Sequence, residues 1–428
     1  MRGRTLPIRQ AAGLALSASP VAAAALWAAG AGVIWWFLAL RIATPDEAGR
    51  LLAVLGIATL SAEFASLGIG HVLLRYLPTA GASASTMART AFALVVCATC
   101  IVATAVVVSP VRISPVVTPT LVYPLVLAAI ALGTASYALT DSLLLSLGHH
   151  RWILARSVGT GLARVGLLWF VAGAPETTWW LLGMAYSLPA LLATGITVAL
   201  LRRFLLRDVG LKALLTRREV ARFAPYGLRS YSANLGGAVP VNALPPLIAW
   251  QLGPSSAAEY GVAWLVASTL MLVPGAVSLT NLATVSRGEK PRESMVSRGI
   301  SVVLAVQLPA VVAALLIAPS VFSMLGDEYS DVGLGVLAPL LGGVVCLSLT
   351  SQLYSRARLT EGGIRVVASG QWLQATLIVA LSALLMPRIG ITGVSVAWLV
   401  GAGTALLFIL IAAPLLWRGD VLDRQNTD

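Results

Sequence analysis

The stretch AFALVVCATCIVATAVVVS, residues Ala91–Ser109, runs for 19 residues without a charged side chain. About 20 apolar residues in helical form span the roughly 30 Å hydrocarbon core of a bilayer. Inside hydrocarbon the backbone N–H and C=O groups must pair within the segment, which favours a helix. This stretch therefore predicts a membrane-spanning helix.

Similar apolar stretches recur along the whole chain of 428 residues, of which 58% are hydrophobic and 11% charged. A soluble domain has about 45–50% apolar and about 25% charged residues. The sequence predicts an all-α polytopic membrane protein with about twelve transmembrane helices. We place them at Ala11–Leu40, Leu51–Leu77, Ala91–Ser109, Thr120–Gly148, Trp152–Ala172, Thr178–Leu201, Phe223–Leu252, Ala258–Val285, Ser297–Leu325, Val332–Tyr354, Val366–Met386 and Ile389–Trp417.

The distribution of basic residues predicts the orientation of these spans. With a cytoplasmic N-terminus, 23 of the 29 Lys and Arg fall in inner segments and helix ends, and four fall in outer segments. Lys and Arg concentrate on the cytoplasmic side of membrane proteins. We therefore predict that both termini are cytoplasmic, and we attribute the net charge of +12 to topology rather than to a nucleic-acid partner.

The chain has the pattern of a duplication. Leu139–Leu143 (LTDSL) recurs 210 positions later as Leu349–Leu353 (LTSQL), each at the inner end of the fourth span of its half. We predict a 6+6 parallel repeat: an N-terminal lobe at 1–201, a basic cytoplasmic linker at 202–222 and a C-terminal lobe at 223–428. Two lobes in the same orientation around a central cavity suit transport by alternating access.

Glycine and proline mark possible gates. The seventh span contains Gly236, Gly237 and Pro240, followed by two further prolines, and the first span contains Gly30 and Gly32 in the equivalent place. Such residues free backbone groups, which a span tolerates only against protein or a wet cavity. We predict a gate or hinge at these five positions.

A few basic side chains remain inside or at the ends of the spans. An ionisable group costs several kcal/mol in hydrocarbon, roughly 2.5–3.5 at a helix centre, so each needs a reason. One hypothesis is that Arg75, Arg164 and Arg229, with His71 one turn from Arg75, line a cavity that attracts a phosphate-bearing substrate. The alternative is that Arg75 reaches the interface and that Arg164 pairs with Asp141.

Two acidic residues are candidates for coupling or ion pairing. Asp141 lies about a third of the way into the fourth span, and Glu63 lies within the second. For Glu63 the alternatives are a proton- or cation-coupling site and a neutral, hydrogen-bonded carboxylic acid. The chain has only three Cys and three His, so we predict neither a metal site nor a cofactor.

Several short motifs occur in an order that resembles a known superfamily. They are Ala43–Arg50 (ATPDEAGR), Leu67–Gly70 (LGIG) with Leu74–Pro78 (LRYLP), Thr140–Trp152 (TDSLLLSLGHHRW), Leu252–Gly261 (LGPSSAAEYG) and Arg388–Val394 (RIGITGV). The chain resembles the polysaccharide-transporter (Wzx-like) branch of the multidrug/oligosaccharidyl-lipid/polysaccharide exporter (MOP) flippase superfamily. The resemblance covers nearly the whole length.

The resemblance implies a fold and a function. The fold is two six-helix lobes around a V-shaped cavity, and the function is transbilayer movement of a polyprenyl-pyrophosphate-linked oligosaccharide for surface polysaccharide biosynthesis. The Arg of the family's second span corresponds to Arg75, and its Asp in the fourth to Asp141. The implied partners are the lipid-linked oligosaccharide, membrane lipids, a polysaccharide polymerase and glycosyltransferases.

Two other functions stay open. One is a small-molecule exporter similar to the multidrug (MATE) members. The drug/cation antiporters of the superfamily have an acidic residue in the first span, and this chain has none there. The other is a membrane polymerase or glycosyltransferase, but the predicted outer loops are short and their acids scattered, so we expect no enzyme. Arg outnumbers Lys 27 to 2, which favours a high-GC bacterium and its plasma membrane.

Overall fold

The structure, a computed structural model, describes residues 8–108, 122–205, 217–272, 274, 292–326, 329, 332–358 and 363–425. Every regular element in these residues is a helix. The helices are α1 (Ile8–Ile42), α2 (Pro45–Ser66), α3 (Ile69–Tyr76), η1 (Leu77–Thr79), η2 (Gly81–Ser83), α4 (Ala84–Val108), α5 (Val122–Ser146), α6 (His150–Ala172), α7 (Trp179–Leu200), α8 (Arg202–Leu205), α9 (Arg217–Gln251), α10 (Pro254–Leu270), α12 (Arg292–Leu325), α13 (Leu334–Ala357), α14 (Gly363–Ile389) and α15 (Ile391–Gln425).

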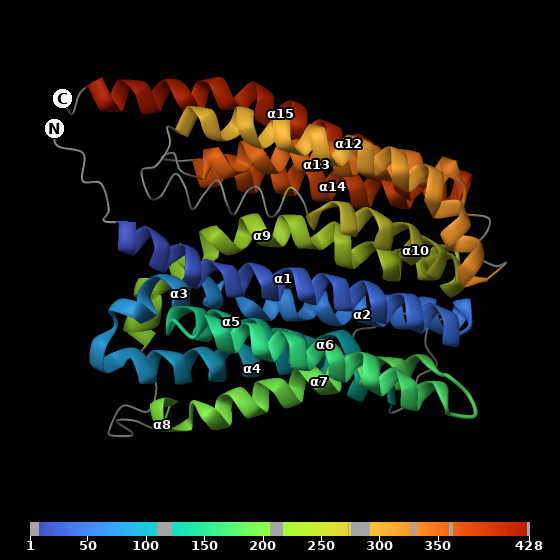
Figure 1. The fold of residues 1–428 in the computed structure, drawn as a ribbon, viewed down its shortest axis with the longest axis horizontal. Coiled ribbons are helices and arrows are strands. Elements are labelled where there is room, and N and C mark those ends of the chain that lie inside the picture. The colour runs from blue at the N-terminus through green and yellow to red at the C-terminus, as the bar shows by residue number, and fades with distance from the viewer. Residues whose placement is uncertain are drawn as a thin grey trace.

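The long helices lie side by side, as membrane spans do (Figure 1). Among the described residues, ten helices are long and apolar enough to cross a bilayer. The helices α9 and α10 lie where the seventh and eighth spans are predicted. The chain is therefore a multi-pass, all-helical membrane protein. The start of α1 and the end of α15 lie at the same end of the bundle, as an even number of crossings requires.

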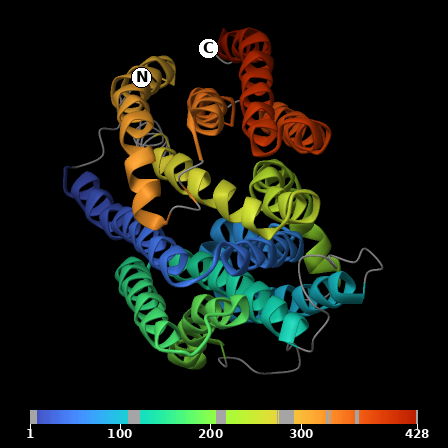
Figure 2. The same ribbon diagram turned by 90° about the vertical axis from the view of Figure 1, so that its right-hand side faces the viewer.

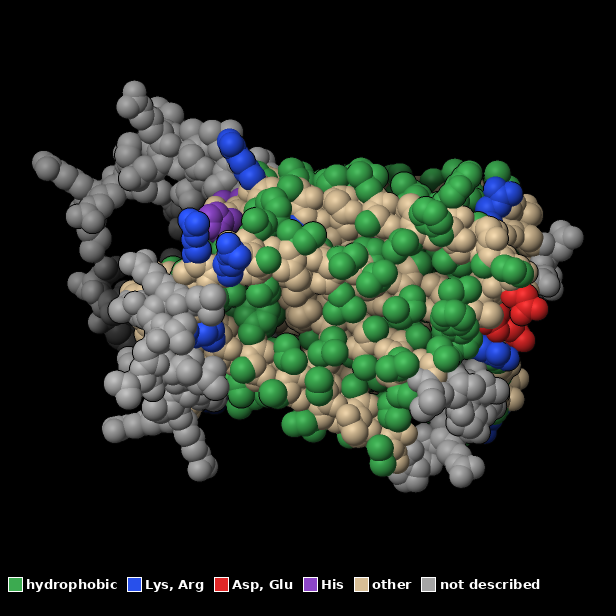
Figure 3. Space-filling model, turned by 90° about the horizontal axis from the view of Figure 1, so that it is seen from below, with side chains coloured by type: hydrophobic (Ala, Val, Ile, Leu, Met, Phe, Trp, Pro, Cys, Tyr) green, Lys and Arg blue, Asp and Glu red, His purple; other side chains and the backbone are tan. Residues whose placement is uncertain are grey.

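Hydrophobic side chains cover the middle of the bundle (Figure 3). Lys, Arg and His side chains gather at one end of the face shown, and acidic side chains lie at the opposite end with a few basic ones. An apolar band between two polar ends is the surface that a bilayer selects. We call the first of these ends, where α1 begins and α15 finishes, the basic end.

The second predicted span, Leu51–Leu77, is not one helix. It breaks after Ser66, where Leu67 and Gly68 adopt left-handed conformations with φ of 47° and 69°. A residue other than glycine pays a steric cost there, whereas Gly68 does not. A Cβ at Gly68 would also collide with the carbonyl oxygen of Gly227 on α9. The break gives α3 its own direction and lets this turn approach α9 closely.

The seventh span differs from the prediction in the opposite way. The glycines and prolines of this segment predict an interruption, but α9 is one continuous helix from Arg217 to Gln251. A neighbouring helix supports it, because Cβ atoms at Gly236 and Gly237 would meet Gln371 of α14. The predicted interruption is therefore wrong for this conformation, and a hinge role for Gly236, Gly237 and Pro240 stays a prediction. The start of α9 also extends into the predicted linker 202–222.

The two halves pair their helices in the same way. In the first half α1 packs on α6, α5 on α7 and α4 on α5. In the second half the equivalent helices repeat this, with α9 on α14, α13 on α15 and α12 on α13. Figure 2 shows the first half and the second half as two groups of helices seen near end-on. The 6+6 architecture is thus present in the packing, while the residue limits of the lobes stay a prediction.

The two lobes meet along α2. This helix packs on α9 and α10, and α3 also packs on α9. Two glycines permit the close approach, because a Cβ at Gly49 would collide with the carbonyl oxygen of Pro254 and a Cβ at Gly56 with that of Asn242. Small residues are what let membrane helices pack closely. We call this contact of α2 and α3 with α9 and α10 the inter-lobe seam.

Candidate functional site

A cavity of about 270 Å³ lies on the inter-lobe seam. Its walls come from α2, α3, α4 and α5 of the first lobe and from α9 of the second. The lining residues are Ala62, Glu63, Ser66, Gly68, Gly70, His71, Leu74, Val95, Thr134, Ala135, Ala138, Leu139, Ser142, Tyr231, Asn234 and Ala238. The predicted coupling residue Glu63 and the predicted cavity residue His71 are both among them.

The position of Glu63 follows from helical geometry. It lies seven residues after Gly56 and fourteen after Gly49, and seven residues make nearly two turns of 3.6 residues. Glu63 is therefore on the face of α2 that carries those glycines and faces the second lobe. The two glycines let α2 contact the backbone of the second lobe, whereas Glu63, on the same face, lines the cavity.

A hydrogen bond joins the lobes beside the cavity. The Nδ2 atom of Asn234 on α9 lies 2.6 Å from Nε2 of His71 on α3. An amide nitrogen only donates, so in this pair the His71 nitrogen accepts. The backbone of Gly227 meets Gly68 close by. Together these contacts hold the two lobes in contact at the α3 end of the seam.

The polar groups of the cavity are an acid and several neutral groups. Among the described residues that line it, none is Lys or Arg. Tyr231 is 9% exposed, and its hydroxyl has no hydrogen-bond partner among the described residues. An unsatisfied buried hydroxyl costs about 1–3 kcal/mol, which a ligand that bonds to it would recover.

The predicted basic residues have other positions. Arg75 is exposed at the end of α3, with its guanidinium 5.5 Å from the ring centre of Tyr76. It lies one turn beyond His71 and is not among the lining residues. The side chain of Arg229 lies outside the described residues. The glycines Gly30 and Gly32 of α1 have open space where a Cβ would be, so packing does not require glycine there.

Arg164 joins two helices of the first lobe. Its Nε donates to the carbonyl oxygen of Tyr186 on α7 at 2.9 Å, and its guanidinium lies 3.9 Å from the centre of the Tyr186 ring. The same ring packs edge-on against Trp35 of α1. A hydrogen bond and a cation–π contact to one residue give Arg164 a role in packing α6 against α7.

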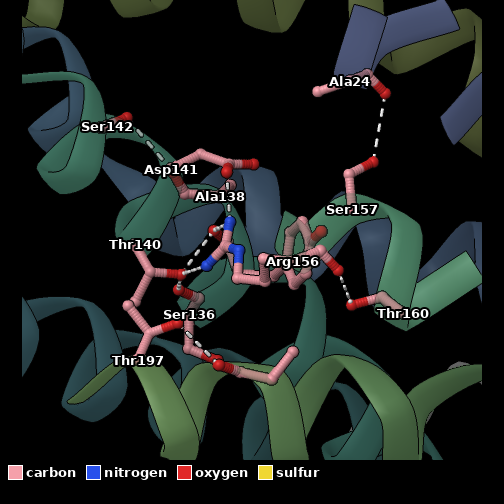
Figure 4. Close-up of polar contacts among 12 residues, drawn as sticks. Ala24, Ser136, Ala138, Thr140, Asp141, Ser142, Arg156, Ser157, Thr160 and Thr197 are labelled. Atoms are coloured by element: carbon pink, nitrogen blue, oxygen red, sulfur yellow. Dashed lines mark hydrogen bonds and ion pairs between the residues drawn. The ribbon is translucent and has the colours of Figure 1, made fainter. Parts of the chain in front are cut away.

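The alternative in which Asp141 pairs with Arg164 is wrong, because Asp141 pairs with Arg156 (Figure 4). The Arg156 side chain is 2% exposed. It also donates to the Thr140 hydroxyl and to the carbonyl oxygen of Tyr137, the latter at 3.2 Å, and lies 3.8 Å from the centre of the Tyr137 ring. This cluster ties α5 to α6 inside the first lobe.

Depth in the membrane explains the choice of partner. Asp141 lies five residues before the end of α5, and Arg156 lies six residues after the start of α6. Because the two helices run antiparallel from a short turn, these residues reach the same level. Arg164 lies eight residues farther on, about 12 Å deeper at 1.5 Å per residue. Distance from the turn is the sequence signal that finds this pair.

Sequence reasoning also missed polar residues of the cavity lining, among them three that lie on α5 and α9. Asn234, Tyr231 and Ser142 line the cavity but are not among the predicted site residues. They are neutral side chains, which are common in membrane helices, so nothing in their own segments distinguishes them. Only their convergence on the cavity of Glu63 and His71, from the two helices α5 and α9, gives them a shared place.

Comparisons with known proteins identify the fold. No protein-family model and no curated protein sequence matches the chain. Among solved structures, an inward-facing multidrug resistance MATE family transporter of the MOP superfamily is 16% identical, with a TM-score of 0.64 and coverage of 92% of this chain and 95% of that one. The lipid II flippase MurJ in an inward closed conformation is 11% identical, with a TM-score of 0.67 and coverage of 91% and 86%.

A third structure, a MOP superfamily transporter from Pyrococcus furiosus described with a binding pocket of reversed polarity, is 14% identical. Its TM-score is 0.61, and the match covers 93% of this chain and 95% of that chain. At these identities the likeness is one of fold. The chain has the two-lobed helical fold found in transporters of the MOP superfamily.

Proposed function

We propose that this chain is a transporter that moves a polyprenyl-pyrophosphate-linked oligosaccharide across a bacterial plasma membrane by alternating access. The observation that carries the proposal is the cavity on the inter-lobe seam, a mostly apolar space with a few polar groups, at the place where movement of one lobe against the other would open or close it. Both termini would be cytoplasmic. A polysaccharide polymerase and glycosyltransferases would consume and supply the substrate.

The neutral groups of the cavity suit the sugar portion of this substrate. Ser66, Ser142 and Asn234 offer hydroxyl and amide groups, and Tyr231 offers a hydroxyl that lacks a partner among the described residues. Ligand sites commonly combine an apolar lining with a few such groups. Sugar hydroxyls both donate and accept, so they match this set without needing a charged partner.

The pyrophosphate would lie toward the α3 end of the cavity. Arg75 follows His71 by one helical turn, and residues four apart share a helix face. The backbone of α9 brings Gly227 of the second lobe against Gly68 at this end. One guanidinium group can bind two phosphate oxygens at once, and it keeps its charge when buried. Arg75 is therefore the residue we assign to the phosphates, and a phosphate-binding role for Arg229, whose side chain lies outside the described residues, stays a prediction from the sequence.

The cavity is close to the lower limit of the usual size of ligand sites. Ligand sites usually enclose about 300–1,000 Å³, and this cavity encloses about 270 Å³. The seam is closed by glycine-mediated contacts and by the hydrogen bond between His71 and Asn234. Loading of a substrate would therefore require the lobes to part at the seam, with α2 and α3 moving relative to α9.

One observation favours a second candidate, export of a small cationic amphiphile. The Glu63 carboxylate faces a cavity whose described lining residues include no Lys or Arg, so a cationic ligand would find a complementary charge there. In the first proposal the same carboxylate would take up a coupling proton or cation. The two candidates therefore differ in what neutralises Glu63 during the cycle.

The test is the pool of lipid-linked oligosaccharide in a deletion strain, measured by mass spectrometry. The strain is complemented with the wild-type chain, with Arg75→Ala, with Glu63→Gln, or with the control Arg388→Ala at the opposite end of the bundle. We expect complete repeat units to accumulate on the cytoplasmic side of the deletion and Arg75→Ala strains. The wild-type and Arg388→Ala strains should return the pool to normal.

Other results would refute the proposal in distinct ways. An unchanged pool with increased sensitivity to cationic compounds would favour the small-molecule exporter. Complete units that reach the outer leaflet but are not polymerised would indicate a membrane polymerase or glycosyltransferase. Full complementation by Arg75→Ala would remove this residue from the phosphate site.

A further inference from the structure

A second cavity, of about 650 Å³, lies at the basic end of the first lobe. It surrounds the turn between α5 and α6 and reaches α1. Its lining residues are Pro20, Gly148, His149, His150, Arg151, Trp152 and Ala155. None of them lines the cavity on the inter-lobe seam, so the two cavities are separate. We call the second one the turn pocket.

The lining of the turn pocket is rich in nitrogen donors. One guanidinium and two imidazoles meet there, and none of the described lining residues is acidic. The Nδ1 atom of His150 is buried and has no hydrogen-bond partner among the described residues. The carboxylate near the end of α5, Asp141, is already paired with Arg156. The basic groups of the pocket therefore have no neutralising partner within its lining.

The backbone adds to this positive character. The helix α6 begins at His150, and its N-cap residue His149 makes no side-chain hydrogen bond to the first turn. The first N–H groups of a helix lack partners within it and carry the positive end of the helix dipole. Gly148, with φ of 77°, makes the tight turn that places this helix start in the pocket. His150 and Arg151 are the first two residues of α6.

The pocket also borders the apolar part of the bundle. Trp152 packs against a small cluster formed by Ala24, Leu144 and Ile153. Tryptophan is enriched where membrane proteins meet the headgroup region. A group that binds here would have an apolar surface on one side and basic donors on the other. Figure 3 shows histidine beside Lys and Arg at this end of the molecule.

We propose that the turn pocket is a binding site for a phosphate group, held by Arg151, His150 and the N-terminus of α6. Phosphate fits because its oxygens accept from guanidinium, imidazole and backbone N–H donors at the same time. The group can come from a phospholipid headgroup or from free phosphate in solution. The site is independent of the transport that we propose for the inter-lobe cavity.

The test compares lipids that differ only in the phosphate. Purified full-length protein is titrated with dioleoyl phosphatidic acid or with dioleoylglycerol, and bound lipid is counted by native mass spectrometry. Variants are Arg151→Ala, Arg151→Lys and Arg203→Ala. Arg203 is an exposed arginine of α8, outside the turn pocket, so it controls for general charge. Thermal unfolding of each variant checks that the fold is intact.

We expect phosphatidic acid to bind better than dioleoylglycerol and Arg151→Ala to weaken it about tenfold, the loss of one charge-assisted contact of about 1.4 kcal/mol. Arg151→Lys should fall between, since lysine keeps the charge and loses the paired geometry. Competition by inorganic pyrophosphate would show that a free phosphate group suffices, and its absence that the headgroup must be carried by a lipid. Equal loss in Arg203→Ala, or equal binding of both lipids, would overturn the site.

Discussion

The pairing of Asp141 with Arg156 gives a prediction that can be tested against an alternative, because the sequence analysis offered Arg164 as the partner. Removing the carboxylate by Asp141→Ala leaves the Arg156 guanidinium, 2% exposed, without its counter-charge. We expect this substitution to destabilise the protein. We expect the double variant Asp141→Ala with Arg156→Met to be more stable than Asp141→Ala alone, because no buried charge then remains.

The magnitude follows from burial. Breaking a buried ion pair by removing one partner costs about 3–5 kcal/mol. The Asp141 side chain is 40% exposed, and Arg156 keeps its contacts with Thr140 and Tyr137. Both facts lower the cost, so we expect about 2–3 kcal/mol for Asp141→Ala. The two residues should also show a coupling energy of about 1–2 kcal/mol, within the range for groups in contact.

The assay is a pair of double-mutant cycles on the unfolding free energy, measured by titrating dodecylmaltoside micelles with sodium dodecyl sulfate. The first cycle joins Asp141→Ala with Arg156→Met. The second is the matched control and joins Asp141→Ala with Arg164→Met. Because Arg164 contacts Tyr186 and not Asp141, the second cycle should be additive within about 0.5 kcal/mol.

Two results would refute the reasoning. Coupling in the second cycle and none in the first would restore Arg164 as the partner of Asp141. A double variant less stable than Asp141→Ala would mean that Arg156 stabilises the lobe mainly through Thr140 and Tyr137.

Three further expectations concern the lobes and their cores. Gly56→Leu should force α2 away from α9, at a cost of about 1–3 kcal/mol for overpacking. Distances between spin labels on the two sides of the seam should then lengthen. The control Gly30→Leu, at a glycine with open space around it, should leave these distances unchanged. His71→Ala and Asn234→Ala should each weaken seam closure by about 1 kcal/mol and be non-additive in a cycle of the same distance measurement; simple additivity would show that their contact does not hold the lobes. Trp398→Phe removes the 3.0 Å hydrogen bond that its indole donates to a buried tyrosine of α10, so detergent unfolding should show a loss of about 2 kcal/mol, and an unchanged value would refute it.

Properties that repeat along the chain predicted the architecture. Apolar runs long enough to span a bilayer predicted an all-helical membrane protein. The match between Leu139–Leu143 and Leu349–Leu353 predicted the duplication, and equivalent helices of the two halves pair alike. These features follow from the local rule that a backbone in hydrocarbon must satisfy its own hydrogen bonds. They need no knowledge of which helices touch.

The candidate site was predictable only in part. Glu63 and His71 stood out because ionisable groups are rare in spans, and both line the inter-lobe cavity. Arg75 and Arg164 stood out for the same reason, and neither is among the lining residues. The free-energy cost of an ionisable group in hydrocarbon identifies a residue as a candidate. Which residues it contacts depends on the helix face on which it lies and on its depth in the membrane.

The sequence by itself determined the class of protein and the repeat, because hydrophobic length and motif order can be read along one chain. Only the tertiary structure decided that Asp141 meets Arg156, that Asn234 closes the seam on His71, and that His150 and Arg151 share a pocket. Each of these depends on the depth and rotation of helices that pack together. A shift of one residue turns a helix by about 100°, so a single span cannot specify its partners.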